Sequence, residues 1–192
     1  MIALIPPDRL ACRQDAPQRA ELVNLAGDGL PEHIWSGLAA PDQDPWEIGR
    51  ARQANAAEQG RIVVADPGQG PVGGLTGYVV GPEPTPTAYD TPDLFRPLIE
   101  LENLVPNSWY VNVLAVYPEF QGKGLGTGLL NIAEQIARSH GVSRMSLIVD
   151  EKNTPARQLY ARHGYTELTR RAFDPGTWQT ASREWILIAK DL

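Results

Sequence analysis

Residues 109–128 read WYVNVLAVYPEFQGKGLGTG, and this stretch decides the fold class. Apart from Asn112, its first eight residues are apolar or aromatic, which is typical of a strand, and Pro118 ends the run. A regular helix over about 124–140 is predicted next, because apolar residues recur there on one face. With a further strand at 145–149, the order strand–helix–strand indicates at least one parallel crossover in a sheet.

Strands and helices are also predicted on both sides of this unit. The expected strands cover 8–13, 61–66, 72–80, 165–171 and 183–189. The expected helices cover about 15–27, 46–58, 91–103 and 153–163. Two stretches are expected to lack regular structure, namely 28–45 and the proline-rich 81–88. The pattern predicts an α/β (α+β) fold: a mixed, mostly antiparallel, twisted sheet of about six to seven strands with flanking helices.

The chain has 192 residues with 17 basic and 23 acidic side chains, and its length fits one domain spanning 1–192. Residues 1–108 hold 14 of the 17 prolines and carry 7 basic and 15 acidic side chains, a net charge of −8. Residues 109–192 carry 10 basic and 8 acidic side chains, a net charge of +2. Without a block rich in Lys and Arg, the chain lacks the charge pattern of a nucleic-acid binder. The acidic first part would attract a cationic partner, although acidic surface needed only for solubility predicts the same charge.

Cysteine, histidine and apolar runs exclude further classes of protein. The single cysteine, Cys12, permits neither an intrachain disulfide nor a cysteine-based zinc site, and it is expected to be a buried apolar residue in a strand. The three histidines lack the spacing of metal ligands, so no metal is expected. The apolar start ends at Pro6-Pro7 without a basic flank, unlike a signal or transit peptide. Since no apolar run approaches the ~20 residues of a membrane span, a cytoplasmic protein without a membrane segment is the expectation.

The glycines between the strand and the helix predict an anion site. Four of them alternate with other residues over 122–128 and let the backbone approach a ligand closely. The start of the following helix adds free N–H groups and about half a positive charge, so a pyrophosphate is the expected occupant. Neither a dinucleotide fingerprint nor a P-loop fits, because the glycines and the lysine stand at other spacings. A simple turn is the alternative interpretation.

Two motifs carry a resemblance to a known family. Gln121-x-x-Gly124-x-Gly126 after the strand resembles the acetyl-CoA signature of the GNAT superfamily of N-acetyltransferases. Residues 153–165 resemble that family's second motif, with its asparagine, alanine, tyrosine and closing glycine–aromatic pair. The resemblance implies a GNAT-like fold with an acetyl-CoA-binding core at 109–166. Acceptor-side elements would lie mainly in 1–108, and C-terminal strands in 165–192.

The resemblance also implies where acetyl-CoA, the acyl donor, would bind without a metal. The pyrophosphate would lie on the backbone amides of Gln121, Gly122, Lys123, Gly124, Leu125, Gly126 and Thr127. The pantetheine arm would pair with the backbone of Leu114, Ala115 and Val116, where the strand splays from its neighbour. Asn153 would hydrogen-bond the amides of the arm. Lys123 and Arg157 are candidates for phosphate or adenine contacts, and solvated side chains are the alternative.

In the family a phenol points at the CoA sulfur, and here that residue is Tyr160. A phenol near pKa ~10 is a weaker acid than a thiol near ~8.5, so full proton transfer is uphill by about 2 kcal/mol. A hydrogen bond to the developing thiolate is therefore the better role, and a packed aromatic residue on a helix is the alternative. A strand N–H near Val116 would hold the carbonyl oxygen.

The general base is left open by the sequence. The strand at 109–113 has no carboxylate, and Glu100 and Glu102 are the nearest candidates. A solvated helix-end charge is the alternative for both, and water relayed through backbone carbonyls could also act as the base.

The function predicted on this basis is direct transfer of an acetyl group from acetyl-CoA to a primary amine in a ternary complex. The partner would be a small-molecule or peptide amine, with neither nucleic acid nor membrane, and the chain would be a monomer or homodimer. Two alternatives remain: a non-catalytic CoA-binding or sensor protein of the same fold, and an acyltransferase that uses a longer acyl-CoA.

Overall fold

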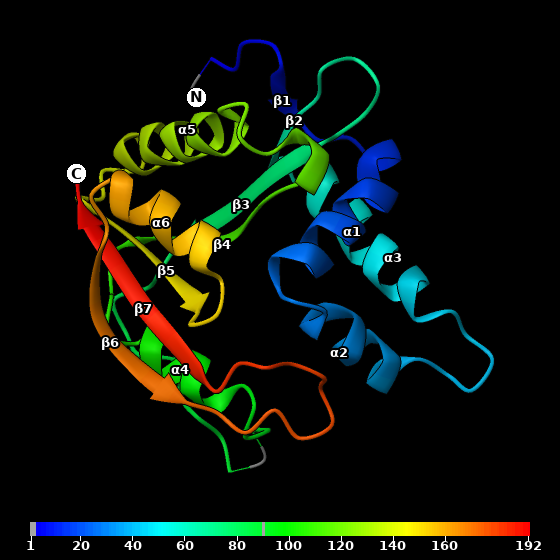
Figure 1. Ribbon diagram of the computed structural model, residues 1–192, viewed down its shortest axis with the longest axis vertical. Coiled ribbons are helices and arrows are strands. Elements are labelled where there is room, and N and C mark those ends of the chain that lie inside the picture. The colour runs from blue at the N-terminus through cyan, green and yellow to red at the C-terminus, as the bar shows by residue number, and fades with distance from the viewer. Residues whose placement is uncertain (1–2, 90) are drawn as a thin grey trace. The chain divides into compact units, whose positions relative to one another are not determined.

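A computed structural model gives the fold for residues 3–89 and 91–192 (Figure 1). The strands are β1 (Asp8–Leu10), β2 (Ile62–Ala65), β3 (Gly73–Val79), β4 (Trp109–Val116), β5 (Arg144–Asp150), β6 (Thr166–Ala172) and β7 (Glu184–Asp191). They form one sheet in the order β1-β2-β3-β4-β5-β7-β6. The pair β4–β5 is parallel, whereas β1–β2, β2–β3, β5–β7 and β6–β7 are antiparallel. This mixed, mostly antiparallel sheet with flanking helices confirms the predicted fold class.

The helices and strands are distributed over two compact units. The helices are α1 (Ala16–Ala26), α2 (Leu30–Leu38), α3 (Pro45–Glu58), α4 (Arg96–Glu102), α5 (Leu125–Ser139) and α6 (Thr154–Arg162), with short 3-10 helices η1 (Arg13–Asp15) and η2 (Pro118–Phe120). The first unit comprises the chain up to Gly77 together with Val113–Ala133. The second unit comprises Tyr78–Asn112 and Glu134–Leu192. Each unit is therefore built from both the acidic and the basic part of the sequence.

In the first unit, α1, α2 and α3 pack against one another (Figure 1). The stretch 28–45 is not irregular as predicted, because it contains α2. Its Pro31 falls in the first helical turn, where the missing N–H of proline leaves no hydrogen bond unmade. Trp35 is only 3% exposed and packs edge-on against Trp46, with ring centroids 5.4 Å apart. Burial of this indole stabilises a short helix that local sequence signals did not indicate.

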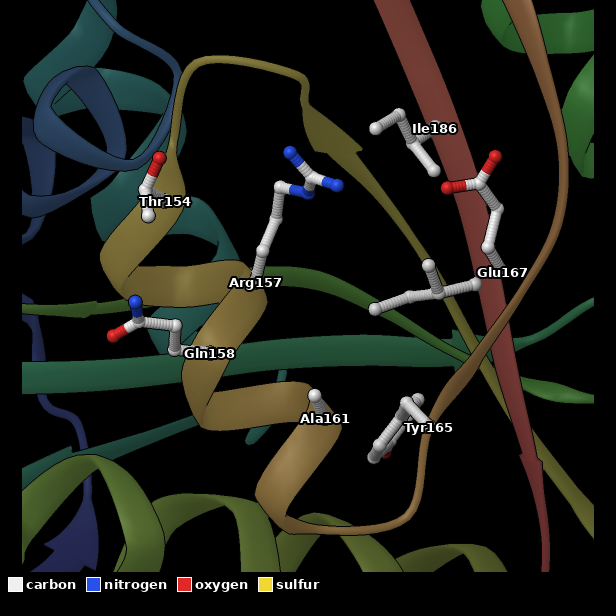
Figure 2. A pocket seen from close by; sticks show the side chains of 8 residues that line it. Thr154, Arg157, Gln158, Ala161, Tyr165, Glu167 and Ile186 are labelled. Atoms are coloured by element: carbon white, nitrogen blue, oxygen red, sulfur yellow. The ribbon is translucent and has the colours of Figure 1, made fainter.

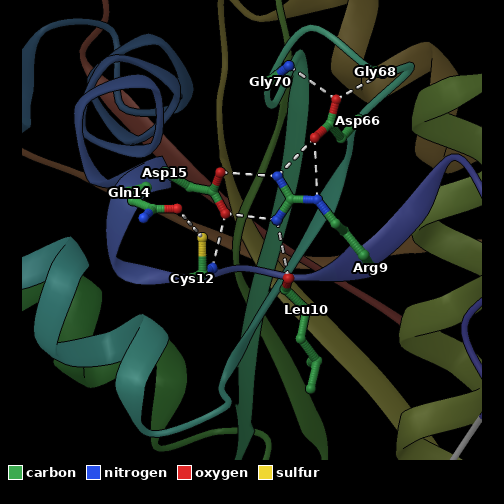
Figure 3. Close-up of polar contacts among 8 residues, drawn as sticks. All are labelled: Arg9, Leu10, Cys12, Gln14, Asp15, Asp66, Gly68 and Gly70. Atoms are coloured by element: carbon green, nitrogen blue, oxygen red, sulfur yellow. Dashed lines mark hydrogen bonds and ion pairs between the residues drawn. The ribbon is translucent and has the colours of Figure 1, made fainter.

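Arg9 of β1 links three segments of the first unit through its guanidinium (Figure 3). It donates to Asp15 at 2.7 and 2.9 Å and to Asp66 at 2.7 and 3.1 Å. Asp66 also accepts hydrogen bonds from the amides of Gly68 and Gly70, which closes the turn between β2 and β3. The hydrogen bonds from Arg9 are the main reason why the pKa of each carboxyl lies below its usual value.

Cys12 is exposed and lies outside a strand, so the prediction of a buried strand residue was wrong. The strand predicted at 8–13 ends at Leu10 instead. The backbone amide of Cys12 donates to the Asp15 carboxylate at 2.8 Å, so the chain turns into η1 at this point.

In the second unit, β7 lies between β5 and β6. Helix α6 lies on one face of these strands in Figure 1, and α4, which contacts all three, lies on the other. The core side chains are apolar and buried, with Met145, Leu147 and Leu187 at most 2% exposed. The contacts of α4 with β5, β6 and β7 hold this helix against the strands.

The connection 80–108 joins β3 to β4 within the second unit. Its ends are held together by hydrogen bonds from Val80 N to Ser108 O (2.8 Å) and from Asn107 N to Val80 O (3.0 Å). Residues 81–88 form neither helix nor strand, as predicted. Helix α4 is shorter than the predicted 91–103, because a start at Arg96 places Pro97 in the first turn rather than in the interior.

Candidate functional site

The glycine loop, defined as residues 121–128, lies in the first unit between η2 and the body of α5. Gly122 and Gly124 have φ values of 72° and 85°, a backbone region that glycine enters without strain. Residues 121–124 are exposed, and the Gln121 amide group donates to Val116 O at 2.9 Å, which ties the loop to the end of β4. The first N–H groups of the 15-residue α5 have no acceptor within the helix, so the loop fits a phosphate group.

The end of β4 precedes this loop in the same unit. Leu114 is half-buried, whereas Ala115 and Val116 are buried. A Cβ added to Gly73 of β3 would lie 3.1 Å from both Ala115 O and Val116 Cγ2, so only glycine lets β3 approach so closely. Lys123 places its ammonium 4.9 Å from the centroid of the Phe120 ring, and its proposed phosphate contact stays a prediction.

Helix α6 carries three of the predicted residues in the second unit. Asn153 caps the helix, because its Oδ1 accepts a hydrogen bond from Ala156 N at 3.2 Å. Its Nδ2 therefore remains as the donor for a ligand. Arg157 donates to Glu151 O at 3.0 Å, which holds its guanidinium at the start of the helix.

Tyr160 is buried on α6, with 6% of its surface exposed. Its ring contacts that of Tyr165, with centroids 5.6 Å apart. Among the described residues its hydroxyl makes no hydrogen bond, and burial alone raises the pKa of Tyr160. The phenol is therefore neutral across the physiological range and can donate a hydrogen bond to a ligand atom.

The two candidate bases at the end of α4 have different partners. Glu100 forms an ion pair with Arg171 of β6 at 3.7 Å. Glu102 instead accepts a hydrogen bond from the Tyr78 hydroxyl at 2.7 Å. Within the described part of the chain Glu102 has no cation bound to it, so it is the better placed of the two to accept a proton from an ammonium group.

Tyr110 connects Glu102 to the α6 region electrostatically. Its pKa is raised first by burial, then by the charge of Glu102 and, more weakly, by that of Tyr160. The backbone N–H of Ile148 in β5 also donates a hydrogen bond to the Tyr110 hydroxyl. Ile148 lies two residues after Ser146, which pairs with Tyr110 in the sheet. Tyr110 therefore lies within electrostatic reach of both side chains proposed for catalysis.

The structure thus places the predicted residues in two groups, described separately. Leu114–Val116 and the glycine loop belong to the first unit, and Asn153, Arg157, Tyr160 and Glu102 belong to the second. In the second unit we define a tyrosine cluster of Tyr78, Tyr110, Tyr160 and Tyr165. Tyr78 and Tyr110 belong to no motif and were therefore not predicted from the sequence. Their only signal was two tyrosines in consecutive predicted strands beside a carboxylate.

A pocket of about 350 Å³ lies beside α6 in the second unit (Figure 2). It is lined by Thr154, Arg157, Gln158, Ala161, Tyr165, Glu167, Ile186 and Ile188. Neither Asn153 nor Tyr160 belongs to this lining. The two charged side chains are already engaged, Arg157 with Glu151 O and Glu167 with Arg170 at 2.8 Å. Tyr165 lines the pocket and also contacts the Tyr160 ring, so Tyr160 lies behind this wall of the pocket rather than in its lining.

Within residues 3–89 and 91–192, no helix is long and apolar enough to cross a membrane. Over the same part of the chain, no group of three or more His, Cys, Asp or Glu side chains could hold a metal ion.

Comparison with known families matches residues 28–165 to the family described as the acetyltransferase (GNAT) family. A mycothiol acetyltransferase of Beutenbergia cavernae is 43% identical over 56 residues, which are 29% of this chain and 19% of that protein. The chain thus spans less than a fifth of that relative's length. Among solved structures, a mosquito arylalkylamine N-acetyltransferase like 5b superposes with a TM-score of 0.67 at 18% identity, covering 96% of this chain and 99% of that one. The PaiA N-acetyltransferase of Thermoplasma acidophilum in complex with coenzyme A gives 0.61 at 14% identity, covering 96% and 98%.

Proposed function

Because the chain belongs to the GNAT acetyltransferase family, and is therefore an acyltransferase, we propose that it moves an acetyl group from acetyl-CoA directly to a primary amine. The single observation that carries the proposal is Tyr160, a buried phenol with an unused hydroxyl in the family's second motif. The neighbouring Tyr165 hydroxyl is also unpaired among the described residues but is fully buried, whereas the Tyr160 hydroxyl is not, so a ligand atom can reach the Tyr160 hydroxyl.

The first unit would supply the binding of acetyl-CoA. Its glycine loop offers backbone N–H groups at a helix start, which suits the pyrophosphate. The backbone of Leu114–Val116 would pair with the pantetheine arm, and the amide of Val116 would stabilise negative charge on the thioester oxygen. These assignments are supported by the exposed loop amides and by the local glycine conformations.

The second unit would supply proton handling. Glu102 would accept a proton from the ammonium group, so that the neutral amine attacks the thioester carbon. As the new C–N bond forms and the C–S bond breaks, Tyr160 would donate a hydrogen bond to the departing sulfur. The second amine proton would leave with the thiol product, so atoms and charge balance. The raised pKa of Tyr160 favours hydrogen-bond donation over full proton transfer.

The test is release of free thiol from acetyl-CoA across a panel of amines, with an amine-free control for hydrolysis. We expect amine-dependent thiol release together with acetylated product in equal amounts. Acetyl-CoA binding without turnover on any amine would identify a CoA-binding or sensor protein. Turnover only with a longer acyl-CoA would show that the chain is an acyltransferase whose donor is not acetyl-CoA.

A further inference from the structure

We infer that Glu102, Tyr78 and Tyr110 form the subsite that receives the acceptor amine as a cation, and that this subsite selects primary amines without a carboxylate. The inference rests on the proposed N-acetyltransferase function and names its substrate class. All three residues belong to the second unit, on β3, β4 and the end of α4.

The geometry combines a carboxylate with two aromatic rings. The rings of Tyr78 and Tyr110 lie with their centroids 5.4 Å apart and their planes tilted by 39°. The Tyr78 hydroxyl donates to Glu102 Oε2 at 2.7 Å, so the edge of one ring is fixed to the carboxylate. Ammonium groups bind favourably to aromatic rings and to carboxylates, and Tyr78, which is 42% exposed, gives a cation access to both.

In the part of the chain that the structure describes, Glu102 has no cationic partner, unlike four other glutamates of the second unit. Glu100, Glu134, Glu167 and Glu184 are each paired with an Arg or Lys side chain. Among the described residues, Glu102 forms no ion pair, and its hydrogen bond comes from a neutral phenol. Its charge is therefore available to a cation that the protein does not itself provide.

The surrounding charge disfavours a second carboxylate at this place. The connection 80–108 carries five acidic side chains and a single basic one, Arg96. Arg96 is engaged with Asp93 at 3.8 Å and donates to Thr91 O at 3.2 Å. Arg171 of β6, the other cation shown beside α4, is paired with Glu100 at 3.7 Å. An acceptor with an α-carboxylate would therefore meet Glu102 where the nearby cations are already paired, and like charges at short range repel.

The environment keeps the aromatic rings in their neutral form. Burial, followed by the hydrogen bond to Glu102, raises the pKa of Tyr78. Burial raises the pKa of Tyr110 in the same way. Both phenols therefore stay protonated wherever an amine is a cation, so the negative charge of the subsite resides on Glu102 alone.

The proline arm, defined as residues 81–87, is fixed next to this carboxylate. Asn103, which follows Glu102, accepts from Thr85 N at 2.8 Å and donates to Thr85 O at 2.9 Å. This two-point contact holds the arm against the end of α4, and its prolines restrict the backbone further.

The test compares 2-phenylethylamine with L-phenylalanine, which differ only in the carboxylate. We expect kcat/KM for 2-phenylethylamine to exceed that for L-phenylalanine by at least about tenfold. In Tyr78→Leu, KM for the amine should rise about tenfold while KM for acetyl-CoA stays within about twofold. Tyr78→Phe keeps the ring and should show a smaller rise. Tyr89→Leu, a fully exposed tyrosine of the same connection, is the matched control and should match the wild type.

Equal use of L-phenylalanine and 2-phenylethylamine, or a Tyr78→Leu enzyme with unchanged amine KM, would overturn the inference while leaving the N-acetyltransferase function intact. Calorimetric binding of 2-phenylethylamine in the presence of CoA separates the two claims. Binding that Tyr78→Leu weakens, without turnover of any amine, would reject the proposed function and keep the subsite. Absence of both amine binding and turnover would reject the N-acetyltransferase function and the amine subsite together.

Discussion

The glycine loop of the first unit and the tyrosine cluster of the second use opposite parts of the polypeptide. The loop is exposed, has two glycines at positive φ and offers backbone N–H groups. Within the cluster, Tyr110, Tyr160 and Tyr165 are at most 8% exposed and offer side-chain hydroxyls and rings. A polyanionic ligand can be held by backbone at the surface, whereas proton handling needs side chains in a low-dielectric environment. We therefore propose that the glycine loop supplies affinity for acetyl-CoA and that the tyrosine cluster supplies the chemistry.

The largest effect is expected from removal of the proposed general base, Glu102. Glu102→Gln should lower kcat by about 100-fold near neutral pH and remove the acidic limb of the pH–rate profile. Glu100→Gln is the matched control, because the Glu100 carboxylate is paired with Arg171. Steady-state kinetics from pH 5 to 9 measure both variants. An acidic limb that persists in Glu102→Gln would exclude this residue as the base.

The glycine loop should respond in affinity rather than in turnover. Gly124 has a φ of 85°, where a side chain costs roughly 1–2 kcal/mol, so Gly124→Ala should raise KM for acetyl-CoA about tenfold. Gly37→Ala is the control, since no atom lies within 4 Å of the added Cβ. A change in kcat larger than the change in KM would contradict the proposal that the glycine loop serves binding of acetyl-CoA and not turnover.

A packing change in the first unit should alter stability without altering chemistry. A Cβ at Gly49 of α3 would lie 2.5 to 2.8 Å from three atoms of the buried Trp35 ring. Overpacking costs about 1–3 kcal/mol, partly offset by the helix propensity of alanine, so Gly49→Ala should lose about 1 kcal/mol. Urea unfolding measures the loss, and Gly37→Ala on α2 should show none. An unchanged midpoint for Gly49→Ala would mean that the indole moves freely.

The smallest effect concerns the Arg9 network. The pKa values of Asp15 and Asp66 are lowered in the folded state, so their stabilisation is complete above the unfolded value near ~4 and is lost as pH falls through the folded values. Arg9 is 38% exposed, and solvent screening limits the effect of Arg9→Met to about 1 kcal/mol. The stability difference between wild type and Arg9→Met should be constant from pH 5 to 8 and shrink below pH 4. A difference independent of pH down to pH 2 would remove the two carboxylates from the explanation.

Local patterns in the sequence predicted the glycine loop, β4 and α6 well, because their signals are contiguous. The glycines of the loop and the asparagine cap of α6 lie within a few residues of the elements they define. Helix α2 was missed because burial of Trp35 against Trp46 stabilises it, a contact between separate helices. The partnership of Tyr78 with Glu102 joins residues 24 positions apart, across a connection whose path no local pattern reveals.

The most direct test of the central claim is the turnover number of Tyr160→Phe, measured together with its acetyl-CoA dissociation constant. Removing one oxygen from a buried phenol leaves its packing against Tyr165 in place. If Tyr160 acts in the chemical step and the glycine loop binds acetyl-CoA, kcat should fall by about 100-fold or more while the dissociation constant stays within about twofold. An unchanged kcat, or a loss of affinity as large as the loss of turnover, would contradict this claim.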